Sequence, residues 1–273
     1  MKENRIWQIW RIFYPPLLYF AISYLVQLLG ILVLVRLNFD FELSSQEELQ
    51  NHIIGIYNQN AMLLTMISAL VSIPICFLLF CADRNREERN GYLWERKPIL
   101  IRQWILVAVL GMAASISMND WIALSGIILI FDGFEQVAEA LYGGSLLIEF
   151  LAIVIAAPFV EELLFRGLVY RRTRVLTGAR AAIILSALYF GIYHMNVVQG
   201  IYAFLLGILL AWVYEKYQTI WAPILFHVSA NFLSVVCTEG NFSYRMTVIG
   251  VLLEIVISTG LMIYAIIRIH RTV

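Results

Sequence analysis

Two adjacent carboxylates and an arginine lie at the end of a long apolar stretch that begins near Ser145. Glu161 and Glu162 are followed, four residues after the second glutamate, by Arg166. A helix inside a membrane has no water around it, and each charge near the bilayer centre costs at least about 2.5 kcal/mol. These residues therefore need polar partners or a water-filled cavity, and they mark a candidate functional site.

Three further polar residues occur in stretches that are otherwise apolar. His194 ends the run that begins at Phe190, and His227 precedes Asn231 by four residues in a later stretch. Residues four apart are neighbours on one face of a helix, so His227 and Asn231 share a face. Phe190 lies one turn before His194 and is expected to form a wall beside the imidazole.

The same spacing rule applies to the acidic motif. Glu162 and Arg166 are predicted to pair on one helix face. Glu161 is rotated by about 100° from Glu162 and can point elsewhere. Pro158 removes the donor for the carbonyl of Val154, which predicts a kink just before the glutamates.

A glutamate and a histidine beside a water molecule form a general-base pair. Glu161 or His194 can take a proton from water as it attacks a carbonyl carbon. The oxyanion that forms needs preorganised donors, which the Asn231 amide and the His227 imidazole can supply. The predicted reaction is peptide hydrolysis without a covalent intermediate, and the chain contains no Gly-x-Ser-x-Gly nucleophile motif.

The same side chains also allow a metal-dependent alternative. Two histidines and a carboxylate, with a fourth position open to water, form a known catalytic zinc set. Glu161, His194 and His227 are the candidate ligands. No His-Glu-x-x-His motif is present, so the sequence leaves both mechanisms, with zinc and without a cofactor, open.

Non-catalytic explanations exist for each residue taken singly. Glu162 with Arg166 can be a structural ion pair, and His194 or Asn231 can be an interhelical hydrogen-bonding residue. A proton relay would use the same groups. The competing functions are a non-enzymatic membrane immunity or peptide-binding protein and a proton-coupled transporter. No matching pair of short, interrupted helices in two halves supports the transporter.

The composition indicates a membrane protein with about eight transmembrane helices. Hydrophobic residues make up 61% of the 273 residues and charged residues 14%, against about 25% charged in soluble proteins. The formal net charge of zero suggests no nucleic-acid partner. We predict an all-α, polytopic protein of the cell membrane with a single domain, 1–273. Spans of about 20 apolar residues are expected at 13–35, 61–82, 103–131, 145–169, 179–198, 201–214, 219–237 and 247–267.

An even number of spans puts both termini on the same side of the membrane. In this topology seventeen of the nineteen Lys and Arg residues lie on one side, and only Arg36 and Arg245 lie on the other. Because basic residues favour the cytoplasmic side, the N and C termini are predicted to be cytoplasmic. The polar segment 38–59 is expected to be a loop, with room for an amphipathic helix.

Helix geometry places the candidate residues at comparable depths. Counted from the nearest inner-side basic residue, Glu161 is roughly 15 Å, His227 roughly 16 Å and His194 roughly 21 Å into the membrane. All three fall within one layer of a core about 30 Å thick. We expect them to converge in a cavity that opens to the inner side, with His194 the deepest.

At these motifs the chain resembles the CPBP family, which contains CAAX prenyl endopeptidases and proteins of bacteriocin processing and immunity. The similarity covers about residues 145–235 and rests on three motifs in order. They are Glu161-Glu162-x-x-x-Arg166, Phe190-x-x-x-His194 and His227-x-x-x-Asn231.

The resemblance implies eight transmembrane helices and an active site within the membrane that faces the cytosolic side. It implies Glu161 as the main base, with His194 aiding the activation of water. It implies His227 and Asn231 as oxyanion stabilisers.

In this family pattern Glu162 and Arg166 are supporting residues. The partners it implies are a hydrophobic or lipidated peptide substrate and membrane lipids. Some characterised relatives cleave after a prenylated cysteine, whereas others mature peptide pheromones or bacteriocins.

Overall fold

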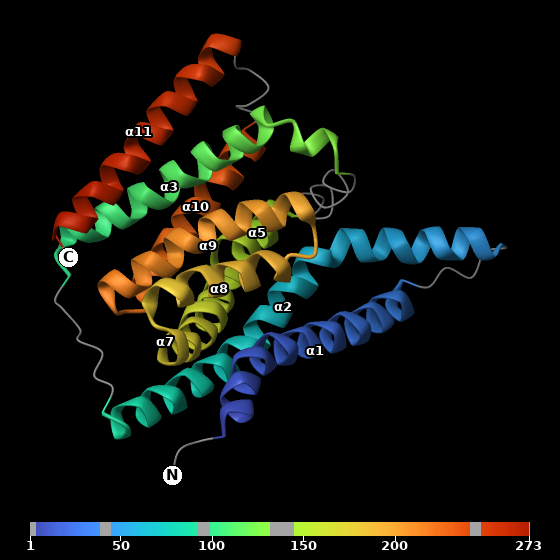
Figure 1. Cartoon of the computed structure of the whole chain (residues 1–273). Helices are drawn as coiled ribbons and strands as arrows, with labels where there is room; N and C mark the ends of the chain where they lie inside the picture. The colour runs from blue at the N-terminus through green and yellow to red at the C-terminus, as the bar shows by residue number, and fades with distance from the viewer. Residues whose placement is uncertain (1–3, 39–44, 92–98, 132–144, 241–246, 273) are drawn as a thin grey trace.

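The computed structural model describes residues 4–38, 45–91, 99–131, 145–240 and 247–272 (Figure 1). Every regular element in these residues is a helix, which confirms the predicted all-α class. Two long helices, α1 Arg5–Leu37 and α2 Gln46–Arg89, pack against each other and are followed by α3 Ile101–Leu124. The later elements are η1 Ile127–Leu129, α5 Leu146–Glu149, η2 Phe150–Ala156, α6 Ala157–Glu162, η3 Leu163–Tyr170, α7 Arg171–Thr177, α8 Ala179–Tyr193, α9 Val197–Tyr217, α10 Trp221–Glu239 and α11 Val248–Thr272.

Apart from the short η1, the described residues form eight helical segments. Six helices are long and apolar enough to cross a membrane, namely α1, α2, α3, α9, α10 and α11. The seventh is the shorter apolar helix α8, and the eighth is the continuous helix 146–177 built from α5 to α7. Apolar side chains on the outer faces of α1 and α11, such as Leu29 and Val256, are exposed. Lipid tails are as apolar as leucine, so these faces suit a bilayer, and the chain is a multi-pass membrane protein.

Helix α2 differs from the prediction, because it has 44 residues and includes most of the segment expected to be a loop. A capping box starts it early. The Ser45 side chain accepts from the Glu48 amide at 3.1 Å, and the Glu48 carboxylate accepts from the Ser45 amide at 3.2 Å. At 1.5 Å per residue α2 is about 66 Å long, so its first turns extend beyond an apolar layer of about 30 Å.

The helix that carries the glutamates contains two π-helical stretches, η2 and η3, around the α-helical α6. In η2 the Ala157 amide donates to the Ala152 carbonyl, five residues back. The next donor in this register would be Pro158, which has no N–H. The carbonyl left without a donor is therefore that of Ile153. In an α-helical register it would be that of Val154. Where we expected a kink, the structure has a π-helical register.

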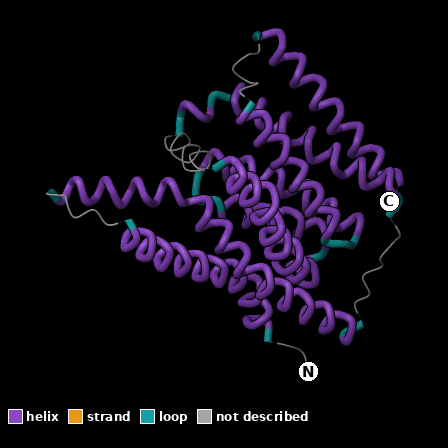
Figure 2. The backbone as a smooth tube through the Cα atoms, turned by 180° about the vertical axis from the view of Figure 1, so that it is seen from behind, coloured by secondary structure: helices purple, strands orange, loops and turns teal. Residues whose placement is uncertain are grey.

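The helices pack through close backbone contacts. Helix α3 lies between α10 and α11, and α8 packs along α9 (Figures 1 and 2). A Cβ at Gly111 of α3 would overlap the carbonyl oxygen of Phe226 in α10. Glycine at this position lets α3 approach the backbone of α10 directly before His227.

The two termini lie on the same side of the molecule. In Figure 1 the beginning of α1 and the end of α11 lie on the side of α7 and the end of α2, while α11 begins on the opposite side. This agrees with an even number of passages. That this arginine-rich side is cytoplasmic stays a prediction from the charge distribution.

Candidate functional site

Glu162 and Arg166 form an ion pair inside the helix bundle. Arg166 Nη1 donates to Glu162 Oε1 at 2.9 Å, and both side chains are fully buried. Arg166 Nη2 donates to the Gly207 carbonyl of α9 at 3.2 Å. The guanidinium lies over the Phe190 ring of α8, 4.5 Å from its centroid. The pairing predicted from the four-residue spacing is confirmed, and it fastens the glutamate-bearing helix to α8 and α9.

His227 of α10 lies between the two glutamates. Its Nδ1 is 2.8 Å from Glu162 Oε1, and its Nε2 is 3.8 Å from Glu161 Oε2. Because an ionised carboxylate only accepts hydrogen bonds, Glu162 holds the proton of His227 on Nδ1. The two glutamates thus point to opposite nitrogens of one ring, as their 100° separation allows.

His194 stands at the end of a helix and not within one. Helix α8 ends at Tyr193, so His194 is its C-cap, and Asn196 begins α9 by accepting from the Gln199 amide at 3.1 Å. His194 Nδ1 is 2.9 Å from the Phe190 carbonyl, which fixes the proton on Nδ1. The Phe190 ring meets the imidazole edge-on at 4.8 Å, as the expected wall. His194 Nε2 is left as an acceptor.

Asn231 lies one turn after His227 on α10. Its Nδ2 donates to the Ile153 carbonyl at 2.8 Å. This is the carbonyl that Pro158 leaves without a donor in the π-helical register of η2. One N–H of the Asn231 amide therefore replaces the backbone donor that Pro158 lacks. This hydrogen bond connects α10 to the helical turn before the glutamates.

The four residues with predicted catalytic roles line one cavity of about 630 Å³. These residues are Glu161, His194, His227 and Asn231. They come from α6, the end of α8 and two turns of α10, and most of the remaining lining is apolar. The fully buried pair of Glu162 and Arg166 lies behind them. The convergence expected from matching depths is therefore seen.

The direction of the cavity differs from the expectation. Its lining reaches the last turns of α3 and α10 and the first turn of α9, for example Asn119, Thr238 and Gln199. These ends lie opposite α7 and the arginine-rich side. Leu164, three residues after Glu161 towards α7, and Phe226, directly before His227, are fully buried. Among the described residues, none of those that line the cavity belongs to α7, so the cavity does not extend to the predicted inner side.

The proposed zinc ligands do not form a metal site in this arrangement. Across the described ranges, no group of three His, Cys, Asp or Glu side chains is close enough together to hold a metal ion. His227 contacts a glutamate through each ring nitrogen, and His194 is bound through Nδ1 to a carbonyl.

Some polar groups at the site were not foreseen. Asp120 of α3 and Glu254 of α11 line the far part of the cavity, and Glu149 is buried within the predicted span 145–169. Carboxylates within predicted spans were the signal that could have identified them. The carbonyls of Ile153 and Gly207 carry no signal in the sequence, because their roles depend on helix register and packing.

Comparison with known proteins finds a family similarity for the segment that contains these residues. A family model described as Type II CAAX prenyl endopeptidase Rce1-like matches residues 143–233. The match runs from just before α5 into α10 and agrees with the resemblance seen in the three motifs. Neither the curated proteins nor the solved structures gave a match. Residues 143–233 are therefore similar to the Rce1-like type II CAAX prenyl endopeptidases.

Proposed function

We propose that this protein is an endopeptidase that hydrolyses a hydrophobic or lipid-associated peptide with a water molecule activated by Glu161. The observation that carries the proposal is the cavity, where Glu161, His194, His227 and Asn231 converge from segments distant in sequence. A largely apolar wall suits an apolar peptide, and a few convergent polar groups are what hydrolysis requires.

In this mechanism the Glu161 carboxylate and the Nε2 atom of His194 activate the water molecule. The Glu161 side chain is 13% exposed and faces the cavity. His194 presents Nε2 as an acceptor because its Nδ1–H is bound to Phe190. A water molecule that donates one hydrogen to each group directs its lone pair outward, and Glu161 removes a proton as the oxygen attacks the peptide carbonyl.

Stabilisation of the oxyanion falls to α10. With Nδ1–H held by Glu162, His227 can donate from Nε2 only as an imidazolium. The positive charge of the His227 ring then neutralises the negative charge of Glu161, and the charge of Arg166 neutralises that of Glu162. Asn231 has a second amide hydrogen beyond the one given to Ile153. These two donors stabilise the charge that develops on the carbonyl oxygen.

Collapse of the intermediate completes the proton balance. The tetrahedral carbon bears the water oxygen, the oxyanion and the peptide nitrogen. Glu161, now protonated, donates to that nitrogen as the C–N bond breaks. The products are an amine and a carboxylic acid, which ionises to a carboxylate by giving its remaining proton to the released amine. Glu161 is again ionised, and the enzyme regains its starting state without a covalent intermediate.

The test is cleavage of a panel of fluorogenic hydrophobic peptides, prenylated and plain, by purified protein in detergent. Glu161→Gln keeps the shape of the side chain but removes the base, so kcat/KM should fall about 10²–10⁴-fold. Glu239→Gln, at the exposed end of α10, is the matched control and should retain activity. Activity that survives Glu161→Gln would sink the proposal.

Addition of a zinc chelator separates the two mechanisms that the sequence left open. Wild-type cleavage that persists under chelation supports a glutamate base acting without a metal, and loss that is restored by zinc supports the metal alternative. If no peptide is cleaved but labelled peptides bind wild type and Glu161→Gln equally, a peptide-binding or immunity protein replaces the endopeptidase.

A further inference from the structure

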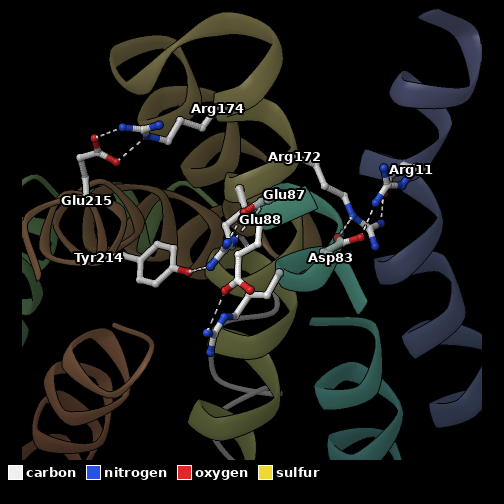
Figure 3. A network of polar contacts seen from close by, with 10 residues as sticks. Arg11, Asp83, Glu87, Glu88, Arg172, Arg174, Tyr214 and Glu215 are labelled. Atoms are coloured by element: carbon white, nitrogen blue, oxygen red, sulfur yellow. Dashed lines mark hydrogen bonds and ion pairs between the residues drawn. The ribbon is translucent and has the colours of Figure 1, made fainter. Parts of the chain in front are cut away.

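A second polar cluster lies on the side of the molecule that holds α7. We call it the inner-face cluster, and it contains Arg11, Asp83, Glu87, Arg171 and Arg172 from α1, α2 and α7. Figure 3 labels four of these residues, namely Arg11, Asp83, Glu87 and Arg172. Asp83 is shared, because it accepts from Arg11 and, at 2.5 Å, from Arg172 Nε. Arg172 also donates to the Arg11 carbonyl. One carboxylate thus serves two guanidinium groups.

The other carboxylate of the cluster is also engaged. Glu87 accepts from Arg171 Nε at 3.3 Å and from its Nη2. Arg171 Nη1 donates to the Tyr214 hydroxyl of α9 at 3.2 Å. Asp83, Glu87, Arg171 and Arg172 are all buried. The cluster is therefore a built, buried arrangement and not a set of solvated surface charges.

A cavity of about 590 Å³ opens beside this cluster. Its lining includes the charged residues Arg11, Asp83, Arg86, Glu87, Arg89 and Arg172. The lining has four guanidinium groups and two carboxylates. Arg11 and Arg172 pair with Asp83, and Glu87 pairs with Arg171, which lies outside the lining. Positive charge exceeds negative charge in the lining, so the cavity favours an anion.

The position of the cavity selects the kind of anion. Trp7 and Trp10 on the first turns of α1 are 51% and 48% exposed, and tryptophans of this kind gather at the membrane–water interface. Gln8 and Arg11, which alternate with them, line the cavity. Val175 and Leu176 complete the lining with apolar surface. A ligand here meets arginines and apolar side chains at the level of the lipid headgroups.

We propose that this cavity binds the phosphate of an anionic phospholipid headgroup. Arginine suits phosphate because its planar fork donates two parallel hydrogen bonds. Basic pockets between transmembrane helices at the cytoplasmic side are known to bind such headgroups. The lipid's acyl chains would run along the exposed apolar face of α1, which includes Ile9 and Phe13. This site is independent of the proposed hydrolysis.

The experiment measures thermal unfolding of purified protein in a neutral detergent. Short-chain phosphatidylglycerol, phosphatidylcholine of equal chain length and inorganic phosphate are the three probes. Saturating phosphatidylglycerol should raise Tm by about 5 °C or more, while the other two should leave it nearly unchanged. An equal shift with phosphatidylcholine would overturn recognition of the headgroup charge, and an equal shift with inorganic phosphate would overturn the lipid as ligand.

Substitutions of arginines at the rim of the cavity test whether phosphatidylglycerol binds there. Arg86→Gln with Arg89→Gln removes two rim charges and spares the buried arginines, so the Kd for phosphatidylglycerol should rise at least about tenfold. Arg89→Gln alone, with an exposed side chain, should show a smaller rise if the double variant does not fold. Arg268→Gln on α11 is exposed, lies outside the cavity and removes the same kind of charge. An unchanged Kd in both rim variants, or an equal rise in Arg268→Gln, would refute the site.

Discussion

His227 is the residue at which the ion pair and the cavity meet. Its Nδ1 contacts Glu162 Oε1, the same oxygen that accepts from Arg166, and its Nε2 faces Glu161. Glu162 thus fixes the orientation of the His227 ring and the nitrogen that carries its proton, and His227 in turn lines the cavity. A group acting in this way positions another residue without contacting substrate.

Glu162→Gln should therefore separate turnover from binding. A neutral amide weakens the support of an imidazolium at His227, so kcat should fall about 10–100-fold while KM changes less than threefold, because Glu162 does not reach the cavity. Steady-state cleavage kinetics of the variant and of Glu239→Gln measure this. A change confined to KM would contradict the positioning role.

Asn231 donates one amide hydrogen to the Ile153 carbonyl, and in the proposed mechanism it donates the other to the oxyanion. Asn231→Asp keeps the size of the side chain but replaces its amide donors with oxygens and, when ionised, places negative charge where the oxyanion forms. We expect kcat to fall about 10²–10³-fold. Asn119→Asp makes the same change at an exposed residue of the cavity lining and should cost far less. Comparable losses in both variants would point to a general effect of added charge.

At the scale of the helices, the π-helical turn before Pro158 determines which backbone carbonyl is available to Asn231. The hydrogen-bond register of the helix therefore affects the geometry of the site. Pro158→Ala restores an N–H that can bond along the helix, and Asn231 then competes with it for the Ile153 carbonyl. Cleavage activity should fall at least about tenfold although Tm does not drop, since proline inside a helix is itself costly. Unchanged activity in the cleavage assay would show that the register has no influence.

The contact between α3 and α10 offers a second test at this scale. Gly111→Ala places a methyl group against the Phe226 carbonyl and should push the helices apart next to His227. We expect a loss of about 1–3 kcal/mol in the free energy of unfolding, measured by thermal or denaturant unfolding. Gly260→Ala on α11 meets no atom within 4 Å and should be neutral or slightly stabilising. Equal stability of the two variants would disprove the close contact.

Local spacing in the sequence was enough to predict several contacts of the site. The pairing of Glu162 with Arg166, the wall formed by Phe190 and the convergence of His194 and His227 all result from helical periodicity and depth. The sequence leaves room for an amphipathic helix in 38–59 but does not predict that α2 begins at Gln46 and continues unbroken into the span, because the prediction does not include the cap formed by Ser45 and Glu48. The π register and the direction of the cavity depend on how side chains fill the space between helices, which periodicity does not encode.

At the scale of the whole molecule, the charge distribution predicts which face meets the cytoplasm. In a background with the three native cysteines replaced by alanine, Leu129→Cys in the exposed η1 turn should react with an impermeant maleimide added to intact cells. Thr272→Cys at the end of α11 should react only after permeabilisation. The reverse pattern would invert the topology and place the cavity towards the cytoplasm.

Two π-helical stretches, η2 and η3, flank Glu161 and Glu162, so the direction of the carboxylates depends on the number of residues before them as well as on their identity. One residue corresponds to about 100° of helix rotation. Deleting a residue between 150 and 156 would turn Glu161 away from the cavity and Glu162 away from His227, with every motif residue still present. Among related sequences this helix should therefore tolerate substitutions but neither insertions nor deletions, and its length is as much a signature of the site as the glutamates.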